Sequence, residues 1–441
     1  MLRILRLLVA TVSVLIFSIS SYAQNMVNRL ELLDKAKYLS EVGNYSQAIE
    51  LLDEYKTQIG EDQEYLKIKA RVLALSGDSA GAIKILEPLL SFSPNDYGLM
   101  YSKTLAIASG RDPQSLLSHL ATLSELDPES IDTKNINRVL RASLKPEIGA
   151  NFAFQNNSDG TSFQLAGISA SNYISPTLKI FGGADSLFMH ATDTSGYAAI
   201  NGSSEVTYNR AWLGVRKLIN KSFEVDALGG GGKTSFHSNG VYEIGVNYWQ
   251  GNKLNGRFSH RQDLVTVSPL AASIGVLRNS NRLEANWTPD YKNTIASSFN
   301  YDTYSGNNTR WEVNLAPRRS FIRSSLLNLD LGLSGQWLGF SKPNALGYYS
   351  PSSYSRYAVT FFSYWKIDDD SGLSVVGSAG PQKGDPMTAY RMSGGIGAEY
   401  FYGIYKDLFF KVSLSALNYG ATQGANYRSN NLMFSLTYRG F

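Results

Sequence analysis

The segment Leu254-Asn255-Gly256-Arg257-Phe258-Ser259 alternates apolar or small residues with polar ones. The same alternation returns in Leu283-Glu284-Ala285-Asn286-Trp287 and in Trp311-Glu312-Val313-Asn314-Leu315. Neighbouring residues of a β-strand point to opposite faces, so each segment predicts a strand with one apolar and one polar face. Many such segments of about ten residues, separated by turns, are typical of a β-barrel that crosses a membrane.

The alternation extends from Pro146 to Phe441, so we assign residues 145–441 to the barrel. An even number of strands places both barrel ends on one side of the membrane. The long connections at 189–203, 263–280 and 341–353 all follow odd strands and are expected to point outward, while 318–326 is slightly long for the other side. Sixteen strands are predicted, at 146–156, 162–172, 177–188, 204–217, 223–234, 241–250, 253–262, 281–289, 294–304, 310–318, 327–340, 354–367, 373–382, 389–402, 408–417 and 427–441.

The polar faces of these strands are expected to line the barrel interior. A basic group facing lipid at the bilayer midplane costs about 2–4 kcal/mol, so charged sets must turn inward. Sixteen strands leave an aqueous interior unless a loop plugs it. The candidate lining residues are Arg257, Arg261, Asp263, Glu284, Asn286, Glu312 and Asn314.

The N-terminus has the pattern of a secretory signal peptide over residues 1–23. Arg3 and Arg6 precede a mostly apolar run from Leu7 to Ile19, and Ala23 ends a small-residue cleavage pattern. A retained anchor helix is the alternative. A cleaved signal before a barrel predicts the outer membrane of a bacterium, with its lipid and its barrel-assembly machinery as partners.

Composition excludes several other classes of protein. The chain has no cysteine, which excludes disulfides, thiolate metal sites and a catalytic thiol. Its net charge of +4 over 441 residues gives no strongly basic face for nucleic acid. We predict no metal and no cofactor.

Residues 24–144 show helical periodicity and an internal repeat. Gly43 to Ala48 recurs as Gly77 to Ala82, and the spacing from Ala48 to Ala82 is 34 residues. The small Ala permits close helix packing, Gly supplies the turn, and Pro94 recurs 34 residues later. These features resemble the tetratricopeptide repeat in about three units. The repeats are expected to dock periplasmic or synthase partners in the periplasm; alternatively, they only cap and orient the barrel.

Two loop segments resemble a known family of outer-membrane proteins. Arg261 to Leu270 and Gly347 to Tyr354 look like loops in the barrel of the cellulose-synthase C-subunit family, and the poly-N-acetylglucosamine export porin has the same plan of repeats before a sixteen-stranded barrel. The resemblance implies a porin-like conduit that exports an exopolysaccharide and is not an enzyme. Aromatic faces stack on sugar rings, so Tyr348, Tyr349 and Tyr354 join the candidate substrate path.

Other readings of these residues remain open. The tyrosines can belong to an aromatic girdle, and a barrel with repeats can instead translocate surface proteins. Ser259 and His260 suggest a barrel-embedded lipid- or glycan-modifying enzyme, but strand neighbours point to opposite faces. The run Gly229 to Gly232 lacks the spacing and the helix of a phosphate loop, and is interpreted as a close-packed part of the wall.

Overall fold

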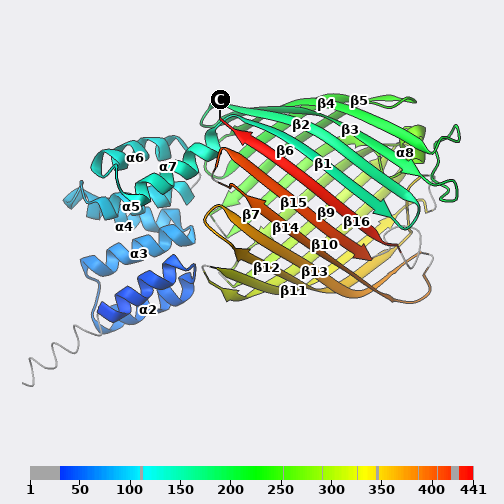
Figure 1. Ribbon diagram of the computed structural model, residues 1–441. Coiled ribbons are helices and arrows are strands. Elements are labelled where there is room, and N and C mark those ends of the chain that lie inside the picture. The colour runs from blue at the N-terminus through cyan, green and yellow to red at the C-terminus, as the bar shows by residue number, and fades with distance from the viewer. Residues whose placement is uncertain are drawn as a thin grey trace, which may run out of the picture. The chain divides into compact units, whose positions relative to one another are not determined.

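The computed structural model describes residues 30–440 apart from 110–112, 252, 291, 325, 344–346, 386, 405 and 419–426. The expected signal peptide and the terminal aromatic Phe441 therefore lie outside the described residues. The chain divides into two compact units, Met1–Gly110 and Arg111–Phe441. Helices form the first unit, and two helices followed by a barrel form the second (Figure 1). Within the described residues, no helix has the length and apolar character needed to cross a membrane.

The helices follow one another at a constant period. A helix through residues 30–41 precedes α2 to α7, and each even-numbered helix starts 34 residues after the previous even-numbered one, as do the odd-numbered ones from α3. This regular spacing extends to α6 and α7. The bounds are α2 Tyr45–Gln58, α3 Gln63–Ser76, α4 Ser79–Phe92, α5 Tyr97–Ser109, α6 Pro113–Leu126 and α7 Ile131–Leu144.

The repeat positions identified in the sequence lie at turns and helix contacts. Ala48 and Ala82 are fully buried, each in the hydrophobic core of its own helix group. Gly43 and Gly77 have φ values of +81° and +85°, a left-handed conformation that costs glycine little. Pro94 follows the end of α4, where it cannot extend the helix.

Sixteen antiparallel strands form a closed barrel, which confirms the predicted fold class. β1 and β16 pair from Glu147 with Arg439 to Asn157 with Ser429, so no strand edge is left open. The bounds are β1 Glu147–Asn157, β2 Thr161–Ser175, β3 Leu178–Ala191, β4 Glu205–Leu218, β5 Phe223–Lys233, β6 Ser238–Gln250, β7 Leu254–Leu264, β8 Leu277–Trp287, β9 Asn293–Tyr304, β10 Asn308–Arg323, β11 Leu327–Phe340, β12 Tyr354–Lys366, β13 Ser371–Gly384, β14 Arg391–Tyr402, β15 Leu408–Asn418 and β16 Ser429–Arg439.

The two ends of the barrel differ in their connections. At the terminal end, where β1 begins and β16 ends, the connections between strands are short. At the opposite end, here called the loop end, 192–204 and 341–353 are long and 265–276 contains the short helix α8, Pro269–Ile274. The prediction that 318–326 is a long connection is wrong, because β10 continues through Pro317 to Arg323. Pro317 has no N–H, and β10 has a further irregularity between Ser320 and Ile322.

The glycine run in β5 packs against β4, which confirms its interpretation as close-packed wall. A Cβ at Gly232 would lie 2.0 Å from the Tyr208 hydroxyl, and one at Gly230 would lie 2.1 Å from the carbonyl oxygen of Ala211. A Cβ at Gly229 would meet nothing within 4 Å. Within this run, therefore, only Gly230 and Gly232 lie where a larger side chain would clash.

We predict that Gly230→Ala destabilises the folded barrel by about 1–3 kcal/mol, because the added methyl group overpacks against backbone that cannot move aside. Gly229→Ala is the matched control and should leave stability within about 0.5 kcal/mol of the wild type. Urea unfolding of the purified protein, followed by tryptophan fluorescence, measures both. Equal losses in the two variants would contradict the packing argument.

Candidate functional site

The faces of the strands separate as the alternation predicts for β7, β8 and β10. Phe258, Leu283 and Trp311 lie on the outer face with 45–53% of their surface exposed. Arg257 and Glu312, on the opposite face, join polar networks between strands. The outer face therefore suits lipid, and the interior is lined by paired charges.

Arg257 is the centre of one interior network. Its guanidinium donates to both carboxylate oxygens of Asp226, at 2.6 and 2.9 Å, and to Glu243 at 2.6 Å. These groups come from three neighbouring strands, β5, β6 and β7. Bidentate contacts of this kind fix the side chain against the wall.

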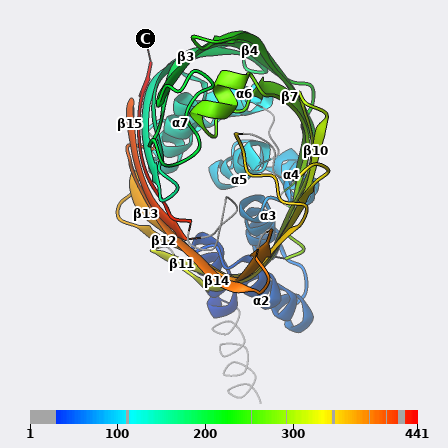
Figure 2. The same ribbon diagram turned by 90° about the vertical axis from the view of Figure 1, so that its right-hand side faces the viewer.

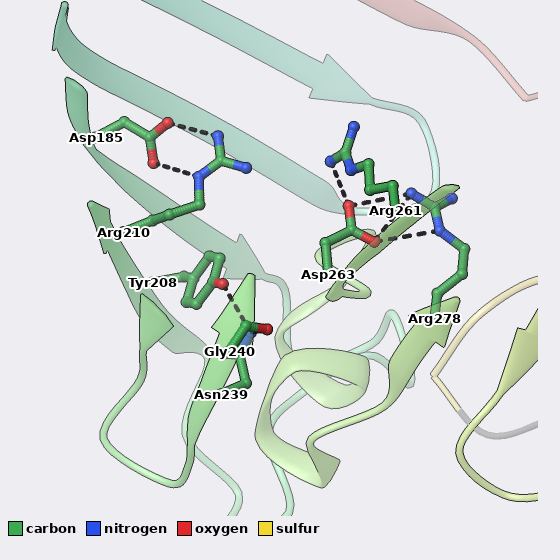
Figure 3. A network of polar contacts seen from close by, with 8 residues as sticks. All are labelled: Asp185, Tyr208, Arg210, Asn239, Gly240, Arg261, Asp263 and Arg278. Carbon is green, nitrogen blue, oxygen red and sulfur yellow. Dashed lines mark hydrogen bonds and ion pairs between the residues drawn. The ribbon is translucent and has the colours of Figure 1, made fainter. Parts of the chain in front are cut away.

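A second network lies nearer the loop end (Figure 3). Asp263, which is buried, receives hydrogen bonds from Arg261 and from Arg278 of the adjacent strand β8. In the same view Arg210 donates to both oxygens of Asp185 across β3 and β4, with distances of 3.2 and 2.6 Å. Each of these charges has its partner in the wall.

The remaining predicted lining residues also lie on the interior face. Glu284 pairs with Arg282 at 2.5 Å, and Asn286 donates to Asn255 at 3.0 Å. Glu312 accepts hydrogen bonds from Asn314 at 3.1 Å and from its other neighbours Asn300, Arg310 and Gln336. The structure therefore brings the predicted polar residues into several local networks rather than one site.

Loops fold into the barrel at the loop end. In Figure 2 the helix α8 lies inside the ring of strands, and it contacts β3 and β4. Ser268 caps this helix by accepting from the Ala271 N–H at 3.0 Å, and its hydroxyl donates to the Gly347 carbonyl at 2.6 Å. A Cβ on Gly347 would come within 2.7 Å of the Ala271 nitrogen, so only glycine permits this approach of two loops.

Hydrophobic contacts hold this loop layer on both sides. Ala272 packs with Met189 and Tyr208 of the wall, whereas Ala271 packs with Tyr304 and Tyr348. The Tyr304 and Tyr348 rings stack with centroids 5.0 Å apart. The connection 265–276 is therefore a packed inner layer, so a loop does enter the barrel interior.

A cavity of about 380 Å³ lies beside this layer, between the loops and the inner wall of β1 to β3. Tyrosines from three connections line it: Tyr197 from the first, Tyr348 and Tyr349 from the second, and Tyr427 from the third. The rest of its lining includes both apolar and polar side chains, among them Phe163, Leu165, Leu187, Gln155, Asn157, Asp159, Thr161 and Thr266. The cavity therefore offers aromatic faces together with hydrogen-bonding groups.

The loop tyrosines stay neutral and can donate hydrogen bonds. Burial raises the pKa of Tyr197, and burial likewise raises the pKa of Tyr349 and of Tyr348. The Tyr349 hydroxyl donates to the Asp385 carbonyl at 2.9 Å, and the Asp385 carboxylate accepts from the Ser352 N–H at 2.8 Å. The hydroxyl of Ser352 lowers the pKa of Asp385, which keeps this anchor ionised.

The three tyrosines of the Gly347 to Tyr354 segment do not act together. Tyr348 and Tyr349 line the cavity, but Tyr354 begins β12, is buried and donates to Gln382 at 3.0 Å. Tyr197, Phe163 and Tyr427 were missed by sequence reasoning. Their sequence shows only that each is an aromatic residue in or beside a connection at the loop end. That pattern does not indicate which connections contact one another in the folded barrel.

Ser259 and His260 lie on opposite faces of β7, as their adjacency predicts. His260 hydrogen-bonds Tyr242 at 3.0 Å and Asn281 at 2.9 Å on the outer face. Ser259 shares its face with Arg257 and Arg261. The two side chains therefore cannot form a nucleophile and base pair.

No family model matches the chain. No curated protein matches it either. Among solved structures, a bacterial polysaccharide outer membrane secretin aligns over 68% of this chain and 99% of its own, with a TM-score of 0.55 and 13% identity. OccAB4 of Acinetobacter baumannii aligns over 66% of this chain and 97% of its own, with a TM-score of 0.35 and 11% identity. CdiB of the same organism aligns over 67% of this chain and 60% of its own, with a TM-score of 0.42 and 8% identity. The chain thus has the fold of outer-membrane β-barrels.

We predict that Ser268→Ala loosens the loop layer without unfolding the barrel. The change removes a helix cap and a buried hydrogen bond, together about 1–3 kcal/mol of local stability. Hydrogen exchange measured by mass spectrometry should speed up in residues 265–276 and stay unchanged in β12. Equal protection of 265–276 in the variant and the wild type would show that Ser268 does not hold the layer.

Proposed function

We propose that this barrel is a conduit for export of an exopolysaccharide from the periplasm to the cell surface. The observation that carries the proposal is the loop-end cavity, where tyrosines from three separate connections surround a space lined with hydroxyl, amide and carboxylate groups. Sugar rings present apolar faces and polar edges, and this lining matches both.

The chemistry of the lining suits a polymer that slides. Stacking on one aromatic ring contributes only about 0.5–1.5 kcal/mol beyond burial, so each contact is weak and reversible. Conduction needs binding strong enough to admit the cargo and weak enough to release it. The charged groups of the wall are held by one another and compete little for sugar hydroxyls.

The loop layer supports a selective conduit rather than an open porin. Residues 265–276 occupy part of the interior and pack on two hydrophobic clusters. Cargo must therefore pass beside them, next to Tyr349 and Tyr197. Our proposal includes no catalytic step and no cofactor.

The helices before the barrel have a place in the same proposal. We place them in the periplasm as a tetratricopeptide-type array that docks periplasmic or synthase components. Removal of α2 to α5 should leave an assembled barrel but trap the polymer inside the cell envelope. Normal surface polymer from the shortened protein would contradict the docking role.

Tyr349→Ala and Tyr197→Ala are each predicted to weaken binding of sugar oligomers about 2- to 10-fold, since each removes one stacking face. The measurement is block of single-barrel conductance in planar bilayers. Tyr349→Phe keeps the ring and should retain most of the block.

Tyr301→Ala is the matched control, because Tyr301 lies on the outer face with 42% of its surface exposed. In cells, deletion of the gene should abolish or trap a surface polysaccharide. A normal glycan with a missing surface protein would favour the alternative, translocation of proteins. A barrel whose current no sugar affects would overturn export.

A further inference from the structure

A second cavity lies in the interior near the terminal end of the barrel. Its volume is about 270 Å³, and interior residues of β1 to β4 and β16 line it. Phe181 and Trp212 provide aromatic surface, and Ser169, Ser171 and Thr437 provide hydroxyl groups. This lining combines the same two kinds of group as the loop-end cavity, at the other end of the interior.

The Trp212 ring lies against the wall, over a glycine of the neighbouring strand. In the register, Trp212 of β4 faces Gly183 of β3 and Gly230 of β5. A Cβ on Gly183 would lie 2.7 Å from Cζ2 of the indole, so the ring occupies the space that a side chain there would take. The tryptophan therefore covers the wall instead of filling the interior.

Phe181 is arranged in the same way one step closer to the terminal end. Its partner across β3 and β4 is Gly214, and a Cβ there would lie 2.6 Å from the phenyl Cζ. Phe181 and Gly183, over which the Trp212 ring lies, are two residues apart on β3, a separation of about 7 Å along the strand. Two aromatic rings thus follow each other along one wall. Both rings are partly exposed, and a guanidinium lies over part of each, that of Arg210 at 5.0 Å from the Trp212 ring centroid and that of Arg216 at 5.6 Å from the Phe181 centroid.

The charges around these rings are already paired. Lys179 lies 3.4 Å from Glu147, which also accepts from Arg439 at 3.0 Å. Arg216 lies 3.6 Å from Glu224. Because every charge of the cavity lining has an opposite charge beside it, the cavity favours an uncharged ligand with hydroxyl groups.

We propose that this cavity is a second sugar subsite, in which Trp212 and Phe181 stack on uncharged hexopyranose units. The inference rests on the proposed export function. It adds a site near the terminal end where the exported sugar chain first contacts the barrel. Both cavities use the inner wall of β1 to β3, so a chain stacked on Trp212 continues along these strands toward Tyr349.

The test uses the full-length protein in planar bilayers with cellohexaose as an uncharged probe, added to one side at a time. Trp212→Ala should shorten each block from the terminal side about 2- to 10-fold, and Trp212→Phe should restore most of it. Trp365→Ala is the matched control, since Trp365 lies on the outer face and is 40% exposed. Cationic glucosamine and anionic galacturonate hexamers should block less than cellohexaose.

The outcomes separate this subsite from the export function itself. Unchanged block in Trp212→Ala, with weaker block in Tyr349→Ala, would overturn the subsite and leave export standing. Stronger block by either charged hexamer would overturn the uncharged class. A wild-type barrel that cellohexaose does not block would overturn both proposals.

A fluorescence titration gives a second readout that a merely structural Trp212 would not move. Cellohexaose should change the tryptophan emission of the wild-type protein, and this change should disappear in Trp212→Phe although block is retained. The same emission change in Trp212→Phe would place the sugar beside another tryptophan and overturn the assignment.

Discussion

Closure of the sheet is the constraint on which the rest of this structure depends. A backbone N–H or C=O left unpaired in hydrocarbon costs several kcal/mol, so a sheet can cross a bilayer only without an edge. The eleven residue pairs between β1 and β16 meet this requirement. Once the ring is closed, alternation along each strand assigns every side chain either to lipid or to the interior.

The chemical character of the barrel interior depends on how its charged side chains are paired. Arginines reach across strands to carboxylates, as Arg257 does to Asp226, and leave few charges for a ligand. What lines the two cavities besides these pairs is mainly aromatic surface and uncharged polar groups. The two cavities gather these groups at opposite ends of one wall, and the loop layer around α8 lies inside the ring of strands (Figure 2).

Sequence reasoning succeeded where one local rule decides the outcome. The pattern from Leu254 to Ser259 assigns its faces because a charge in lipid is costly, and the glycine run in β5 indicates close packing because no side chain is present. It failed where pairing with neighbouring strands decides the outcome. The strand predicted to end at residue 318 runs to Arg323, because residues after Arg318 still pair with β11.

The sequence by itself determined the strand count, the faces of the clearly alternating strands and the 34-residue helical period, because all three depend on contacts between near neighbours along the chain. Only the tertiary structure decided which loops meet. Ser268 and Gly347 are 79 positions apart and share a hydrogen bond. It also decided that Tyr208 and Trp212 of β4 face inward, because glycines on β3 and β5 leave the space that these side chains occupy.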